Sequence, residues 1–232
     1  MNKILLLIIT IFSIQLISAQ RTYTFDYMIG FTSQRSLNMP INMEVALINS
    51  KNNDYHLLVV NDGSLEFKFH FIDHKIGFQT IFYLEKEAFL KANRINLDCD
   101  YVKKIRTPKW NRKYAGKYFF ENLKDTIIND TAFNHIVMKK RAKKNKRLSR
   151  RKKLDLHFIT YKDKKFDMPF IANHYIHISW EQLVDKENFN FDIIKEQYSI
   201  KDNKKEWIYK FVEVNKIENK YISVPEACDY SN

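Results

Sequence analysis

The stretch YHLLVVNDGSLEFKFHFI, residues 55–72, decides the fold class. An apolar run reaches Val60, a polar segment covers 61–64, and large apolar and polar residues then alternate up to Ile72. Alternation of period two places one set of side chains on one face of a strand, and an Asp-Gly pair between two such runs is the strongest short-range signal of a hairpin. The sequence therefore predicts two antiparallel strands joined by a tight turn at 61–64.

Similar strand patterns occur on both sides of this hairpin. They cover 22–29, 43–47, 78–84, 118–123, 131–138, 154–160, 193–200, 206–217 and 221–224. Within 206–217, strict alternation puts Tyr209 and Phe211 on one face, and Val212 and Val214 on the other. Short strands joined by polar turns predict a mainly β fold, a curved antiparallel sheet or half-barrel with one or two short helices; α+β is the alternative.

Two segments have helical composition. Residues 85–92 are expected to form a short helix. A second helix is expected to begin at Ser179, which would cap it, with Gln182 at the capping-box position.

The first nineteen residues have the features of a secretory signal peptide. Lys3 precedes an apolar run from Ile4 to Leu16, and Ser18 and Ala19 provide a small-residue cleavage site. Because a spanning helix needs about 20 apolar residues, we expect cleavage after Ala19, with an uncleaved anchor as the alternative. Residues 20–232 would then form a single β-rich domain in the periplasm or outside the cell, and not an integral membrane protein.

The chain has two cysteines, Cys99 and Cys228. An even number of cysteines in an exported protein favours a disulfide. Two separately buried thiols, or a redox or metal role, are the alternatives, although no CxxC spacing supports the latter.

Positive charge is concentrated in one run, from 139 to 153. Eleven of its fifteen residues are Lys or Arg and none is acidic, whereas acids and bases balance in the rest of the mature chain. These anion-binding candidates are Lys139, Lys140, Arg141, Lys143, Lys144, Lys146, Arg147, Arg150, Arg151, Lys152 and Lys153. Such a run stays solvated and attracts polyanions. Export favours an anionic envelope surface or polyanion over nucleic acid, and a solubilising loop remains the alternative. His135 and His157 flank the run and would add charge at acidic pH.

Motifs that carry chemistry are scarce. The four glycines are isolated, which excludes phosphate-cradling and dinucleotide-binding loops. The histidines fall in pairs, His70 with His74 and His174 with His177, whereas a zinc site needs three or four convergent ligands. We therefore expect no catalytic residue, no metal and no cofactor.

The hairpin from Lys124-Asp125-Thr126-Ile127-Ile128 to Ile136-Val137-Met138-Lys139 resembles the Asp-x-x-Ile-x-x-Tyr-x-Cys-x-Lys hairpin of the GLPGLI family and the related LolA-like envelope proteins of Gram-negative bacteria. It departs from that pattern at Asp130, where the family has Gly, and it lacks the Cys and the Gly-Leu-Pro-Gly-Leu-Ile stretch. The resemblance implies a half-barrel sheet able to hold an apolar ligand. It transfers no site residue.

These features favour a non-enzymatic exported envelope or secreted protein. An aromatic concave face would hold an apolar ligand or partner, and the basic run would touch an anionic surface. The alternatives are an exported hydrolase that uses His70, His74 or His174 with nearby carboxylates, and a structural component of the cell surface.

Overall fold

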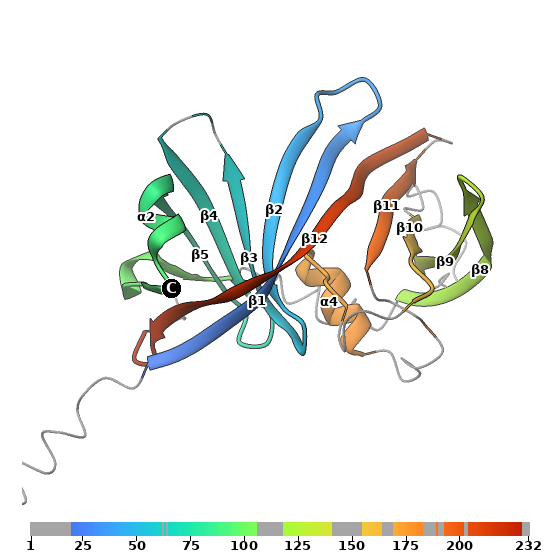
Figure 1. Ribbon diagram of the computed structural model, residues 1–232. Coiled ribbons are helices and arrows are strands. Elements are labelled where there is room, and N and C mark those ends of the chain that lie inside the picture. Colours follow the sequence, from blue (N-terminus) through green and yellow to red (C-terminus); the bar gives the residue numbers. More distant parts are fainter. Residues whose placement is uncertain are drawn as a thin grey trace, which may run out of the picture.

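One open sheet forms the body of the computed structural model, which describes residues 20–61, 63, 65–105, 118–140, 155–163, 169–182, 189, 193–201 and 204–228 (Figure 1). Its first strands are β1 (Gln20–Ser36), β2 (Asn42–Asn49), β3 (Asn52–Asn61), β4 (Glu66–Asp73), β5 (Phe78–Glu85), β6 (Arg94–Asn96) and β7 (Val102–Lys104). The later strands are β8 (Tyr118–Ile128), β9 (Thr131–Lys140), β10 (Asp155–Thr160), β11 (Ile194–Lys201) and β12 (Lys204–Pro225). The strand order is β7-β5-β4-β3-β2-β1-β12-β11-β10-β9-β8, and β6 pairs with β12. The predicted fold class is confirmed.

The hairpin predicted at residues 55–72 is formed by β3 and β4. Their register runs from Tyr55 opposite Asp73 to Asn61 opposite Phe67. Gly63 in the turn has a φ of 85°, a conformation that side chains with a Cβ adopt only with strain. The turn chemistry and the alternation were therefore sufficient to predict this unit.

The longest strands, β1 and β12, pair antiparallel in the middle of the sheet. Their ladder runs from Gln20 opposite Pro225 to Ser36 opposite Glu206, with two shifts of register. The β2–β5 meander extends from one side of this pair, and β11, β10, β9 and β8 follow on the other. Both halves of the sheet are thus attached to one central ladder.

One of these register shifts corrects the predicted facing of residues 206–217. Gly30 lies opposite Glu213 but Phe31 lies opposite Phe211, so Val212 is an extra residue on β12. Phe211 and Val214 consequently join the same cluster of apolar side chains, and Val212 remains exposed. Strict alternation was wrong here because a bulge changes the face on which later residues lie.

Two α-helices occur in the described parts of the chain, α2 (Lys86–Lys91) and α4 (His174–Glu181). The first confirms the helix expected at 85–92. The second begins earlier than predicted, because the side chain of Asn173 caps it by accepting hydrogen bonds from the backbone N–H groups of Tyr175 and Ile176. Ser179 lies inside the helix, and its hydroxyl donates to the carbonyl of Tyr175. The prediction that Ser179 caps the helix was wrong.

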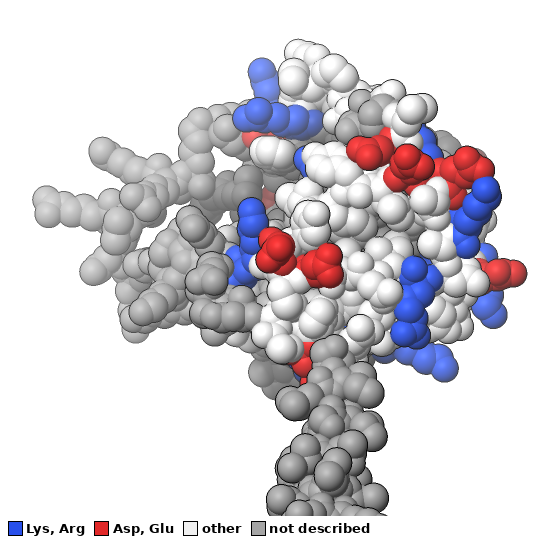
Figure 2. Space-filling view, turned by 90° about the vertical axis from the view of Figure 1, so that its left-hand side faces the viewer, with Lys and Arg blue, Asp and Glu red and all other residues white. Residues whose placement is uncertain are grey.

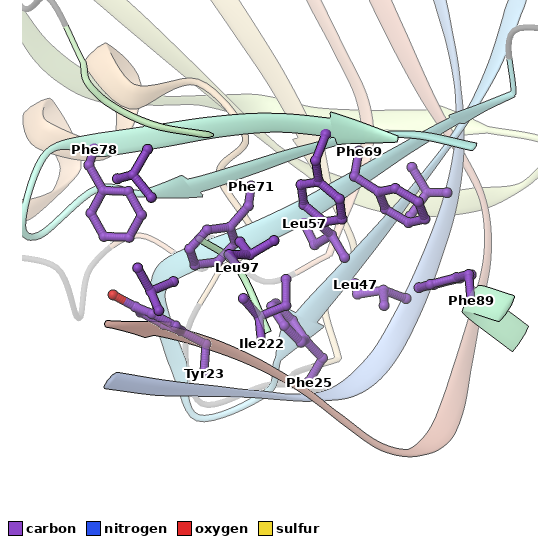
Figure 3. Packing of buried hydrophobic residues seen from close by; sticks show 14 of the residues in the cluster. Tyr23, Phe25, Leu47, Leu57, Phe69, Phe71, Phe78, Phe89, Leu97 and Ile222 are labelled. Atoms are coloured by element: carbon purple, nitrogen blue, oxygen red, sulfur yellow. The ribbon is translucent and has the colours of Figure 1, made fainter. Parts of the chain in front are cut away.

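The largest group of buried side chains covers one face of the β2–β5 half (Figure 3). Phe69 and Phe71 of β4 are fully buried there and face Phe25 of β1 and Ile222 of β12. Phe89 of α2 packs against Phe69, with the ring centroids 4.7 Å apart and the ring planes tilted by 52°. The alternating phenylalanines of the hairpin therefore fill a closed core and do not line an open concave face.

The predicted disulfide joins Cys99 to Cys228, with the two Cα atoms 5.1 Å apart. Cys99 begins the short 3-10 helix η1 (Cys99–Tyr101), and Cys228 packs on the same core as Phe69. The side of the molecule that carries α2 has acidic and basic side chains interspersed among uncharged ones (Figure 2).

We predict that removing this cross-link lowers the free energy of unfolding by about 4 to 5 kcal/mol, because it closes a loop with a sequence separation of 129 residues. Urea unfolding of the oxidised chain, with and without reductant, measures the loss. The double variant C99S/C228S should be insensitive to reductant. A reductant effect that persists in the double variant would contradict the prediction.

Candidate functional site

The face of the sheet opposite the large core, here called the inner face, carries an apolar cluster in each half of the sheet. Strand pairing places Ile48 of β2, Phe31 of β1 and Phe211 of β12 on it. On β11 this face carries the polar residues Gln197 and Ser199. Beyond them it carries Phe158 of β10 and Ile136 of β9, both fully buried.

Among the described residues, the segment Pro169 to Glu181 lies across this face, and we call it the plug. It contains α4, which lies on the inner side of the curve between the two halves (Figure 1). Phe170 packs with Phe31 on the central strands, whereas Ile176 and Trp180 pack over β8–β10. The plug therefore bridges both halves of the inner face.

Buried histidines form the contact between the plug and the β2–β5 half. His74, in the turn after β4, has its Nδ1 atom 3.0 Å from Nδ1 of His174 at the start of α4. Its Nε2 atom is 3.2 Å from Nδ1 of His56 on β3. His177 stacks on His74 with ring centroids 4.3 Å apart. We call these four residues the histidine chain; it leads from the partly exposed His174 to the fully buried His56.

Burial keeps His56 and His74 neutral. Desolvation, with smaller contributions from His70 and His177, lowers the pKa of His56 to about 3. The pKa of His74 is held far below its ordinary value, first by desolvation and then by repulsion from His56, His177 and His174. Because these imidazoles are packed closely together away from water, adding a proton to one of them is unfavourable.

The carboxylate nearest in sequence to the chain has a different role. Asp73 accepts hydrogen bonds from the hydroxyl of Tyr23, at 2.8 Å, and from the backbone N–H of Ile76, at 2.7 Å. Burial raises the pKa of Asp73. His70 contacts the side chain of Gln79 through Nε2, at 3.0 Å. The hydrolase hypothesis used His70, His74 or His174 with nearby carboxylates, but Asp73 is engaged by Tyr23 and Ile76.

His56 was not recognised as a candidate residue in the sequence, because it lies within an apolar strand run and has no histidine nearby. Its one signal was its polarity at a position that alternation assigns to a buried face. Fold topology alone brings it beside His74, eighteen residues away, and beside a helix more than a hundred residues further on.

Of the basic run, the structure describes only the beginning. Lys139 and Lys140 are the last residues of β9, and the side chain of Lys139 forms an ion pair with Glu121 at 2.9 Å. Arg141 to Lys153 lie outside the described residues, and β10 begins at Asp155.

The arrangement defines a class of fold, an open curved β-sheet whose inner face is covered by a helical plug. No family model and no curated protein matches the chain. Among solved structures, the chain is similar to a putative outer membrane lipoprotein-sorting protein domain from Vibrio parahaemolyticus. The likeness covers 83% of this chain and 84% of that one, at 13% identity and a TM-score of 0.29. The likeness is to the same LolA-like group that the hairpin at residues 124–139 resembles, and at that TM-score it carries no further argument. In the described ranges, no helix has the length and apolarity needed to cross a membrane.

We predict that acid loosens the fold through the histidine chain. Because the pKa of His56 is about 3 in the folded protein and 6.5 ordinarily, the unfolded chain binds its proton first as the pH falls. The free energy of unfolding is then at its full value above pH 6.5 and declines below it. Once the pH is a unit lower, His56 alone lowers it by about 1.4 kcal/mol per pH unit. Urea unfolding across this range measures the slope.

His56→Gln should flatten this slope, whereas His70→Gln, which removes only a smaller contribution to the lowered pKa of His56, should retain most of it. Equal slopes for the wild type and His56→Gln would contradict the role of the chain, whatever the stability of the variants at neutral pH.

Proposed function

We propose that this chain is an exported, non-enzymatic envelope protein that holds an apolar ligand or partner on the inner face, in place of the plug. The observation that carries the proposal is an open sheet whose inner face has an apolar cluster in each half, both of them contacted by the plug. Export is supported by the signal-like N-terminus and by the disulfide, since such bonds persist in oxidising compartments.

The contact between plug and sheet suits reversible displacement. Much of it is apolar, so an alkyl chain could replace Phe170, Ile176 and Trp180 with similar burial of surface. The rest consists of the histidine chain, in which His74 stacks on His174 and His177. A cover held in this way separates from the sheet at lower cost than one fixed by a fully buried charge pair.

The basic run from 139 to 153 would bring this carrier to an anionic envelope surface. Lys139 is already paired with Glu121, so the segment available for that contact begins at Arg141. The charge-balanced remainder of the chain gives no competing electrostatic attraction of comparable density.

We predict that the mature chain binds dansyl-undecanoic acid, a fluorescent fatty-acid probe, and that binding displaces the plug. Saturation with the probe should accelerate hydrogen exchange in residues 171–181 while β9 and β10 retain their protection, because the alkyl chain takes over the inner face. Acid should strengthen binding, since protonation of the histidine chain disfavours the covered state.

Two adjacent residues of β12 provide a matched control. Phe211→Lys places a charge on the inner face and should abolish probe binding, whereas Val212→Lys, at an exposed position on the same strand, should not. Unfolding curves verify that both variants fold. Absence of probe binding in the wild type, or equal binding by the two variants, would refute an apolar site on the inner face.

We also predict that replacing residues 141–153 with a Gly/Ser linker of equal length abolishes sedimentation with phosphatidylglycerol-containing vesicles. Wild-type binding should vanish on pure phosphatidylcholine, and near 1 M salt, where the screening length falls to about 3 Å. Vesicle binding that survives the replacement would remove the run from the proposal and leave the apolar site untouched.

A further inference from the structure

A second pair of histidines lies on the outer face of the other half of the sheet, away from the plug. His135 of β9 and His157 of β10 are both half-buried, and Nε2 of His135 is 2.9 Å from Nδ1 of His157. Because the two strands are adjacent and antiparallel, with His135 opposite Ile159, the rings meet diagonally across the ladder. The sequence separation of 22 residues hides this contact from any spacing motif.

We propose that His135 and His157 form a two-histidine chelate for a divalent transition-metal ion, copper(II) above all. Among the described residues no group of three or more His, Cys, Asp or Glu is arranged to hold a metal, so the remaining coordination positions would be filled by water or an external ligand. Imidazole is a good ligand for Cu, Ni and Zn, and copper(II) binds most strongly in the divalent series.

The separation of the two nitrogens favours a particular geometry. An ion about 2.0 to 2.1 Å from each of two atoms 2.9 Å apart makes an angle of about 90° with them. That angle suits neighbouring positions of the tetragonal arrangement typical of copper(II) and nickel(II). A tetrahedral angle would need the nitrogens about 3.3 Å apart. The ion would lie beside the line that joins the nitrogens, and each ring would turn toward it about χ2, a torsion with a broad energy minimum.

Neighbouring side chains orient both rings. The hydroxyl of Thr126 on β8 is 3.2 Å from Nδ1 of His135, and the ring of Tyr198 on β11 stacks on His157 with an interplanar angle of 3°. If the hydroxyl of Thr126 accepts a hydrogen bond from the Nδ1–H group of His135, Nε2 of His135 carries the lone pair that a metal needs. His157 then moves its proton from Nδ1 to Nε2, so two neutral rings bind the ion with no net release of protons.

The charges around the pair are also compatible with a bound cation. Lys205 and Lys139 face the site, but Lys205 is paired with Glu196 at 2.9 Å and Lys139 with Glu121 at 2.9 Å. Asp155 acts on His157 from the start of β10. Desolvation, with smaller contributions from charged neighbours, lowers the pKa of His135 and of His157, so both rings are in their metal-binding form at neutral pH. His135 and His157 therefore add less positive charge beside the basic run at mildly acidic pH than the sequence led us to expect.

Titration of the untagged mature chain with copper(II) at neutral pH, followed by calorimetry and by electron paramagnetic resonance, tests the proposal. We expect one ion per chain and a tetragonal spectrum with nitrogen coupling. His135→Gln and His157→Gln should each weaken binding by about tenfold or more, and Thr126→Val by a smaller factor through loss of ring orientation. His70→Gln is the matched control and should bind like the wild type.

Two results would overturn the proposal. One is the absence of copper binding by the wild type. The other is unchanged affinity in His135→Gln and His157→Gln, which would assign the ion to other ligands, such as the histidine chain under the plug. Since the outer face is remote from the plug, neither result bears on the apolar site.

Discussion

The pairing of β1 with β12 is the interaction on which the rest of the structure depends. These strands contribute the central ladder, and every other strand is attached to one side of it or the other. Because the ladder shifts register between Phe25 and Tyr27, β1 changes the face to which it contributes apolar side chains. Phe25 packs into the core shown in Figure 3, and Ile29 and Phe31 belong to the inner face. One strand can therefore close a core on one side and line a second surface on the other.

Much of the fold was predictable because local rules determine it. The turn at 61–64, the alternation in 66–72 and the helix at 86–91 each follow from residues close together in sequence, and the structure confirms them. The disulfide was predictable from compartment and cysteine count alone. The bulge at Val212 was not, because it depends on how β12 pairs with Gly30 and Phe31, residues far away in the sequence. Gly30 lies close to its partner there, since a Cβ would be 3.1 Å from the side chain of Glu213.

The candidate sites were less predictable than the fold. His74, His174 and His177 were noticed as separate pairs, but their convergence requires a helix that starts at His174, and the sequence suggested Ser179 instead. His135 and His157 were noticed only as neighbours of the basic run. Their contact arises from the register of β9 against β10, which the hydrophobic pattern leaves undetermined because both residues lie on a face with mixed polarity.

The central ladder also determines when the chain can fold. It joins Gln20 to Pro225, so β1 has no partner on that side until nearly all of the chain has been made or has passed through a translocation pore. Contacts so distant in sequence form slowly, since the loop between them must first close. The pairing of β1 with β12 therefore forms late in folding, and the bond between Cys99 and Cys228 lies on the core to which both strands contribute.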